Sequence, residues 1–235
     1  MKKFNRNVLL VMVILICGIF FYSAKGFTFF NTDVQESLVL FTQINLKNDF
    51  TDAAKIGMGD STVQADWQSN YQRLNQQYFK NEFRGQLPDE KIKQLMDAEL
   101  TMNKRRKIQV DDIKVDGDTA SATVSISKVN YSDIVDNAVK NVKDTEASNG
   151  TLSAEDFSAA LADELIKGFN DAAPTDDMTS FSVDVKKVLI NNSADKSANS
   201  ANWLAMYVIP KIAGHCWYPQ DVDDFFGKLS KAIES

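Results

Sequence analysis

The feature that most constrains this 235-residue chain is a charge-free apolar run close to its N-terminus. Residues Val8 to Tyr22 carry no charged side chain, and Lys2, Lys3 and Arg6 precede them. A basic start followed by such a run is typical of a signal peptide or of an N-terminal transmembrane anchor, and residues 1–26 are interpreted as one or the other. Because the basic flank stays on the cytoplasmic side, the rest of the chain is expected outside the cell membrane.

Three fates of this segment remain open. An uncleaved, single-pass anchor is the first: as a helix, Val8 to Ala24 would cover about 25 Å, slightly less than the roughly 30 Å hydrocarbon core. Cleavage near the small residues Ala24 and Gly26 would instead release a secreted protein. Lipidation at Cys17 ranks third, because Ile16 stands where a lipobox has a small residue.

The remaining residues have the composition of a folded, acidic domain. The chain is 44% hydrophobic and 25% charged, which is typical of globular proteins. Four of the 26 basic residues lie in or beside the apolar segment and no acid precedes Asp33, so the rest carries 22 bases against 32 acids. Phosphate backbones repel such a domain, which argues against nucleic acid as a partner. The cysteines, Cys17 and Cys216, are not expected to pair, because Cys17 lies in the apolar run.

Hydrophobic periodicity divides residues 31–235 into the helices and strands of a single extracytoplasmic domain. Helical spacing predicts helices at 32–48, 51–56, 61–83, 89–100, 131–143, 153–169 and 221–233, with capping boxes at Thr32 and Ser61. Alternating patterns predict a hairpin of 107–115 and 118–129, and further strands at 183–190 and 203–209. With a helical pair inserted at about 131–172, this order predicts an α+β fold whose helices pack on a curved antiparallel sheet.

The hairpin carries a register clue. A tight turn at Asp116-Gly117, with both residues at positive φ, would oppose polar and apolar residues further along the two strands. One extra residue at Asp111-Asp112 restores the match, pairing Val110 with Ala122 and Ile108 with Val124, and therefore predicts a β-bulge. The same apolar spacing from Val183 to Ile190 predicts a second bulge at Lys186-Lys187.

Three stretches support a resemblance to a known family: Asn45–Ile56, the hairpin Ile108–Ile126, and the expected strand that begins at Trp203. They resemble a family of uncharacterised extracytoplasmic domains of Gram-positive bacteria, many of them lipoproteins or membrane-tethered proteins. Such domains are similar to the cystatin-like cone of the nuclear transport factor two-like superfamily, in which bulged strands wrap around long helices. The resemblance implies that fold and a place in the cell envelope, and it carries no catalytic residues.

Few residues suggest chemistry. His215 and Cys216 could form a thiol with a nearby base, but sequence neighbours rarely adopt the geometry this needs, and one histidine cannot supply a zinc site. A loop with a buried, inert cysteine is the preferred interpretation. Two acidic sets could hold Ca²⁺, yet neither has the EF-hand spacing, so a bulge-and-turn cluster and a helix start are preferred and no metal is expected. They are Asp111, Asp112, Asp116 and Asp118, and Asp221, Asp223 and Asp224.

Two further patterns have a structural and a functional interpretation. The basic run Lys104–Lys107 could face anionic lipid or cell-wall polymer, but cations are also favoured at a helix C-terminus. An aromatic stripe of Trp67, Tyr71 and Tyr78 could contact a ligand, but an amphipathic helix packing on a sheet needs such a stripe. The chain has no P-loop, G-x-G-x-x-G or G-x-S-x-G motif, and no cofactor is expected.

These observations predict a membrane-tethered, non-enzymatic module that binds an envelope protein, peptide or polymer, with Trp203 and Tyr207 lining a pocket at the open end of the cone. A small hydrolase or isomerase that uses buried carboxylates is the alternative from another class, and a structural subunit of a surface complex is a third. A pocket containing an Asp or Glu with a strongly raised pKa would favour the enzyme. An apolar or empty cone would favour the binding module.

Overall fold

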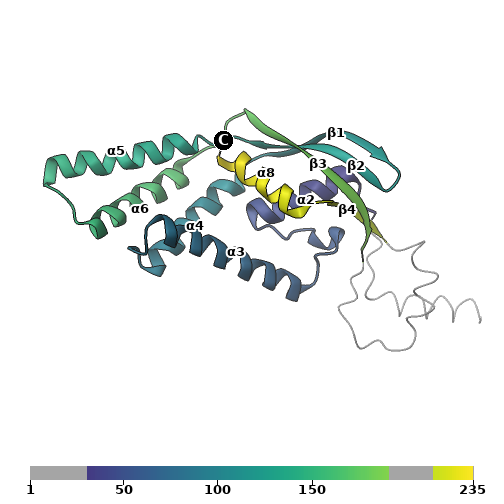
Figure 1. Ribbon diagram of the computed structural model, residues 1–235, viewed down its shortest axis with the longest axis horizontal. Coiled ribbons are helices and arrows are strands. Elements are labelled where there is room, and N and C mark those ends of the chain that lie inside the picture. Colours follow the sequence, from purple (N-terminus) through teal and green to yellow (C-terminus); the bar gives the residue numbers. More distant parts are fainter. Residues whose placement is uncertain (1–30, 191–213, 235) are drawn as a thin grey trace, which may run out of the picture.

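The structure is a computed structural model that describes residues 31–190 and 214–234. These residues form an α+β fold with six α-helices, one short 3-10 helix and four strands (Figure 1). The apolar N-terminal segment, Cys17 and the expected strand from Trp203 to Ile209 lie outside the described residues. Among the helices that are described, none is long and apolar enough to cross a bilayer.

The strands form one open antiparallel sheet in the order β1-β2-β3-β4. Its members are β1 (Ile108–Asp116), β2 (Thr119–Ser127), β3 (Met178–Leu189) and β4 (His215–Pro219). Along β3, Val183 and Val185 are buried while the residues between and beside them are exposed. This alternation shows that β3 turns one face to a core and the other to solvent.

One hydrophobic core lies between this sheet and two helices, α2 (Val34–Lys47) and α8 (Val222–Glu234), which run along the same face (Figure 1). Phe41 of α2 and Phe225 of α8 meet edge to face with ring centroids 5.1 Å apart. The edge strand β4 is covered by the start of α2 and the residues before it: Ser37 accepts a hydrogen bond from the Trp217 N–H at 3.0 Å, and the Thr32 N–H donates to the His215 carbonyl at 2.8 Å. A covered edge does not offer unpaired backbone groups to other chains.

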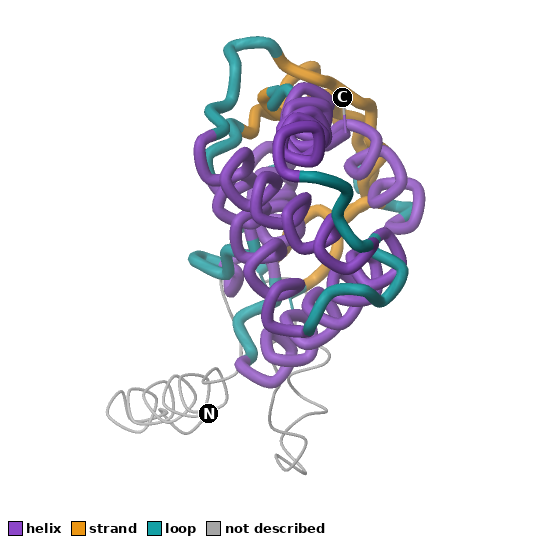
Figure 2. Tube along the Cα trace, turned by 90° about the vertical axis from the view of Figure 1, so that its left-hand side faces the viewer, coloured by secondary structure: helices purple, strands orange, loops and turns teal. Residues whose placement is uncertain are grey.

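A second core lies among four helices beyond the end of α2. These are α3 (Ser61–Glu82), α4 (Asp89–Lys104), α5 (Tyr131–Asn149) and α6 (Ala154–Asp171). Helices α5 and α6 connect β2 to β3 as an antiparallel pair that projects beyond the sheet in Figure 1, and Figure 2 shows the helices lying mostly to one side of the strands. Close packing of the pair depends on Gly168, where an added Cβ would lie 2.6 Å from a methyl group of Ile134.

Most predicted helices are present, but two begin at a different cap. Asp33 caps α2 by accepting a hydrogen bond from the Glu36 N–H at 2.8 Å, whereas Thr32 donates its hydroxyl to the Lys55 carbonyl. Asp60, one residue before the expected Ser61, caps α3. A carboxylate next to the expected hydroxyl is an equally good acceptor and also interacts favourably with the helix dipole.

The first predicted bulge is present, shifted by one residue. Asp111 pairs with Thr123 and Lys114 with Ser121, so β1 carries one extra residue at Asp112-Ile113, and Asp112 has a φ of 52°. The shift arises because the two-residue turn is Gly117-Asp118, of which only Gly117 has positive φ. The predicted pairs are therefore wrong by two positions: Val110 lies opposite Val124, not Ala122.

The second predicted bulge is wrong. Residues of β3 pair with β2 and with β4 in an unbroken register through Lys186 and Lys187. The apolar spacing that suggested a bulge has another cause. Cys216 and Trp217 are consecutive residues of β4 and both are buried, so this strand can pack against apolar residues on either face of its neighbour β3. The interpretation of residues 215–218 as a loop is corrected with it, since they form most of β4.

Candidate functional site

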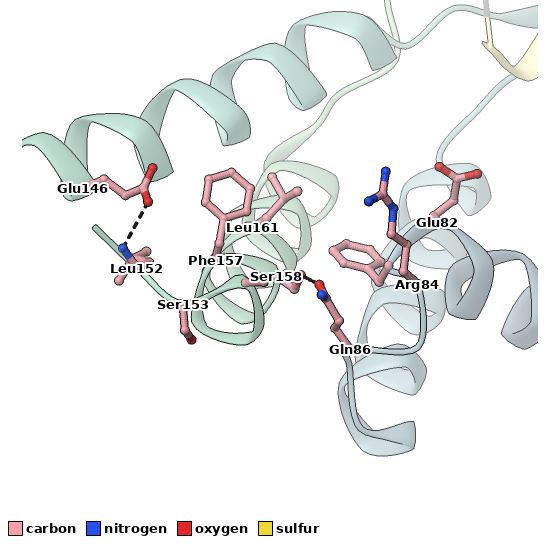
Figure 3. A pocket seen from close by; sticks show the side chains of 11 residues that line it. Glu82, Arg84, Gln86, Glu146, Leu152, Ser153, Phe157, Ser158 and Leu161 are labelled. Atoms are coloured by element: carbon pink, nitrogen blue, oxygen red, sulfur yellow. Dashed lines mark hydrogen bonds between the residues drawn. The ribbon is translucent and has the colours of Figure 1, made fainter. Parts of the chain in front are cut away.

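The described residues line two cavities of functional interest. The larger, of about 610 Å³, lies between the turn after α3 and the α5–α6 pair (Figure 3). Two hydrogen bonds join polar groups of its lining: Ser158 donates to Gln86 Oε1 at 2.5 Å, and the Leu152 N–H donates to Glu146 Oε1 at 3.1 Å. The first bond ties α6 to the turn after α3, and the second closes the connection between α5 and α6.

The smaller cavity, of about 210 Å³, lies where the two cores meet. Its chemically distinctive residues are Tyr71 and Tyr78 from α3, Glu99 and Asn103 from α4, and Tyr131 from the start of α5. The end of α2 and the last turn of α8, with Glu234, close the remaining sides. We call this cavity the tyrosine pocket.

Glu99 is the central acid of the tyrosine pocket. It lies on the inner face of α4, one turn after Leu95, and is only partly exposed. Its carboxylate has no hydrogen-bond or ion-pair partner in the part of the chain that the structure describes. Burial therefore raises the pKa of Glu99 to about 7, and the nearby Arg106 guanidinium opposes the shift.

Arg106 lies behind the pocket and is 1% exposed. Its Nη atoms donate to two main-chain carbonyls, that of Ser127 at 3.3 Å and that of Ile233 at 2.9 Å, while its Nε has no partner among the described residues. These bonds tie the end of α4 to the sheet and to α8. Burial lowers the pKa of the guanidinium, and Glu99 partly offsets this effect.

Asn103 supplies the second unsatisfied group. Its side chain is 5% exposed, and within the described residues its Oδ1 atom has no hydrogen-bond partner. Leaving a buried acceptor unpaired costs roughly 1–3 kcal/mol, so such groups usually bind a water molecule or a ligand. Asn103 also lines the tyrosine pocket, so a ligand there would lie close to this acceptor.

The three tyrosines surround these groups. Burial raises the pKa of Tyr71 to about 12, and it also raises that of Tyr131, with the negative charge of Glu99 adding to both. Tyr78 is half-exposed and forms the outer rim. All three hydroxyls are therefore neutral at physiological pH.

Only some of the site residues predicted from the sequence line the tyrosine pocket. Trp203 and Tyr207, the expected pocket residues, and Cys17, the expected lipidation site, lie outside the described residues. Tyr71 and Tyr78 of the aromatic stripe line the tyrosine pocket, whereas Trp67 packs against Phe226 with ring centroids 6.3 Å apart. The stripe thus divides between a ligand-accessible part and a core part.

The other candidates make contacts within the fold. Cys216 is buried, and burial raises the pKa of its thiol to about 12, so it is no nucleophile at neutral pH. Asp221 caps α8 by accepting a hydrogen bond from the Asp224 N–H at 2.9 Å. The basic run serves the fold, because Arg105 donates to the carbonyls of Asn170 and Ala172 at 2.7 Å. Among the described residues no group of acids, histidines and cysteines is arranged to hold a metal ion.

Sequence reasoning missed Glu99, Asn103, Arg106 and Tyr131, although a signal was present. The buried residues of α4 include Ile92, Leu95 and Met102, and Glu99 continues that helical spacing. A charged residue on the apolar face of a helix is either paired in the core or directed into a cavity.

Fold and pocket together define an α+β domain with a small polar cavity between two cores. No family model matches the sequence, and no curated protein is similar to it. Among solved structures, the fold is similar to that of YcdA from Bacillus subtilis, described as a "putative lipoprotein", with a TM-score of 0.58 and 15% sequence identity. The match covers 84% of this chain and 54% of that protein, so this chain spans about half the length of its structural neighbour. At this identity the likeness concerns the fold.

Proposed function

We propose that this chain is a binding module of the cell envelope, held at the outer face of the membrane by its N-terminal segment, and that the tyrosine pocket receives part of its ligand. The basic flank and apolar run at the N-terminus support the location, as does the fold similar to that of a protein described as a "putative lipoprotein". On this proposal the chain belongs with the membrane-tethered domains that the sequence resembles, and with their cystatin-like relatives.

The observation that carries the proposal is the unpaired Oδ1 of buried Asn103 beside the unpaired carboxylate of Glu99. A buried acceptor without a donor is costly in an unliganded core, and a carboxyl group that lines the same cavity can bind part of a ligand. A volume of about 210 Å³ is below the roughly 300–1,000 Å³ of pockets that enclose whole small molecules. The pocket therefore suits one end group of a larger envelope component.

The experiment is a thermal-shift screen of the full-length, detergent-solubilised protein against fractions of the envelope from which it is purified. A binding fraction should raise the melting temperature of the wild type and of Asp97→Asn, a control on the exposed face of α4. It should not raise that of Tyr71→Leu, a change on the largely exposed helix α3 that leaves both cores intact. Equal shifts in all three proteins, or none in any, would rule the pocket out as the binding site.

A proton-transfer enzyme, such as an isomerase, is the second candidate, and Glu99 specifically favours it. A carboxyl group with a pKa near 7 suits general acid–base catalysis at neutral pH, and tyrosine hydroxyls could stabilise a developing negative charge. We rank it second because a partner for Glu99 that would complete a catalytic pair is missing among the described residues. Mass spectrometry of the bound component separates the two: a binding module returns it unchanged, whereas an enzyme alters it and Glu99→Gln abolishes the change.

A further inference from the structure

We propose that the group recognised by the tyrosine pocket is a primary ammonium group. This inference rests on the proposed function, because it requires the pocket to be a ligand site. Three properties of the lining carry it: its charge, its aromatic walls and its free hydrogen-bond acceptors.

The charged side chains that line the pocket are all acidic. Glu99 and Glu234 both line the pocket, and no lysine, arginine or histidine does so among the described residues. Arg106 does not line the pocket, and its Nη atoms donate to the carbonyls of Ser127 and Ile233, although its charge acts on Glu99. An anionic ligand would lie against two acidic side chains, whereas a cation would compensate a carboxylate that has no hydrogen-bond or ion-pair partner.

The walls suit a cation as well. Tyr71, Tyr78 and Tyr131 come from two helices and enclose the same small cavity. The face of an aromatic ring attracts a cation by about 0.5–2 kcal/mol, with the larger values where water is excluded. Several rings around one cavity are the arrangement by which proteins bind quaternary ammonium groups, so the walls favour a cation without selecting its substitution.

The free acceptors select among ammonium groups. Oδ1 of Asn103 needs a donor, and the Glu99 carboxylate accepts hydrogen bonds when ionised. A primary ammonium carries three N–H donors and can satisfy both, whereas a quaternary ammonium has none. The planar guanidinium group is larger and spreads its charge over a fork, which fits a bidentate carboxylate better than two acceptors on one helix.

The test is an NMR titration of the full-length, detergent-solubilised protein with labelled tyrosine rings. Four small probes differ in charge and donors: ethylammonium, tetramethylammonium, ethanol and acetate. Such small molecules bind in the millimolar range even at high efficiency per atom. Ethylammonium should shift the signals of Tyr71, Tyr78 and Tyr131, with affinity at least about tenfold above that of the other probes, which is about 1.4 kcal/mol.

Two variants test whether Glu99 binds the ethylammonium probe. Glu99→Gln removes the charge but keeps the shape, and should weaken ethylammonium binding at least about tenfold, as expected for a charge-assisted hydrogen bond. Asp97→Asn removes a charge from the exposed face of the same helix and should leave binding unchanged. Unaltered binding in Glu99→Gln would overturn the proposal.

The possible results distinguish a failure of the ammonium assignment from a failure of the proposed function. If ethanol or acetate binds as well as ethylammonium, the ammonium assignment fails and the pocket remains a ligand site. Stronger binding of tetramethylammonium would overturn the choice of a primary ammonium in the same way. If no probe shifts the tyrosine signals of the folded protein while an envelope fraction still stabilises it, the ammonium assignment fails on its own. If neither the titration nor the thermal-shift screen detects binding, the proposed function fails as well.

Discussion

Replacing Glu99 by glutamine should change the stability of the protein in a pH-dependent manner. Burial raises the pKa of Glu99 from its ordinary 4.5 to about 7, so between these values the folded protein holds a proton that the unfolded chain has released. Because the folded state binds more protons, the free energy of unfolding of the wild type should fall as the pH rises through this range. At about 1.4 kcal/mol per pKa unit, the full loss is about 3 kcal/mol.

Glutamine has almost the same shape and does not ionise. Glu99→Gln should therefore match the wild type near about pH 4 and exceed its stability by up to about 3 kcal/mol near about pH 8. The groups that face Glu99 do not mask the effect. The phenols of Tyr71, Tyr78 and Tyr131 stay neutral because their pKa values are raised, and Arg106 stays charged. The charge of Glu234 is common to both proteins.

The assay is urea unfolding followed by tryptophan fluorescence, carried out across the pH range on the wild type, Glu99→Gln and Asp97→Asn. The Asp97 side chain is 67% exposed, so its replacement should shift the curve by a small, pH-independent amount. A stability difference between Glu99→Gln and the wild type that stays constant with pH would refute the reasoning. It would mean that the Glu99 carboxylate is solvated in the folded protein.

Three further predictions concern the sheet, the helical pair and the anchor. Val110→Asp should cost several kcal/mol because Val110 is 1% exposed, whereas Ile113→Asp should cost less than about 1 kcal/mol because Ile113 is 38% exposed. Equal costs in denaturant unfolding would contradict this difference in burial. Gly168→Ala should lower the melting temperature by overpacking the α5–α6 interface, whereas Gly227→Ala, where an added Cβ would have no neighbour within 4 Å, should raise it slightly. A higher melting temperature for Gly168→Ala than for Gly227→Ala would exclude this packing. Cys17→Ser should leave the protein in the membrane fraction, with its domain digested by protease added to spheroplasts; release into the medium would show a lipid anchor.

The helices and the hairpin were predictable because their signals are local. Apolar residues at a period of 3.6, ended by capping residues or by a glycine such as Gly57, need only neighbours in the chain to specify a helix. The hairpin and its bulge follow from matching apolar residues across one short turn. The errors of one residue at Thr32, Ser61 and Asp116 arise where two adjacent residues can serve the same cap or turn, and the wider structure selects between them.

The tertiary structure alone decided which local patterns share a core and where a cavity remains. The prediction of a second bulge was wrong because the burial of Val188 depends on β4, a strand that pairs with β3 but lies far from it in the sequence. The tyrosine pocket joins residues from α2 to α8, and no spacing along the chain shows that Glu99 and Tyr131 line one cavity. The sequence by itself determined the acidic composition of the domain and most of its helices and strands, since these depend on residue content and local period. The site depends on how two cores meet, and contacts between distant residues determine that.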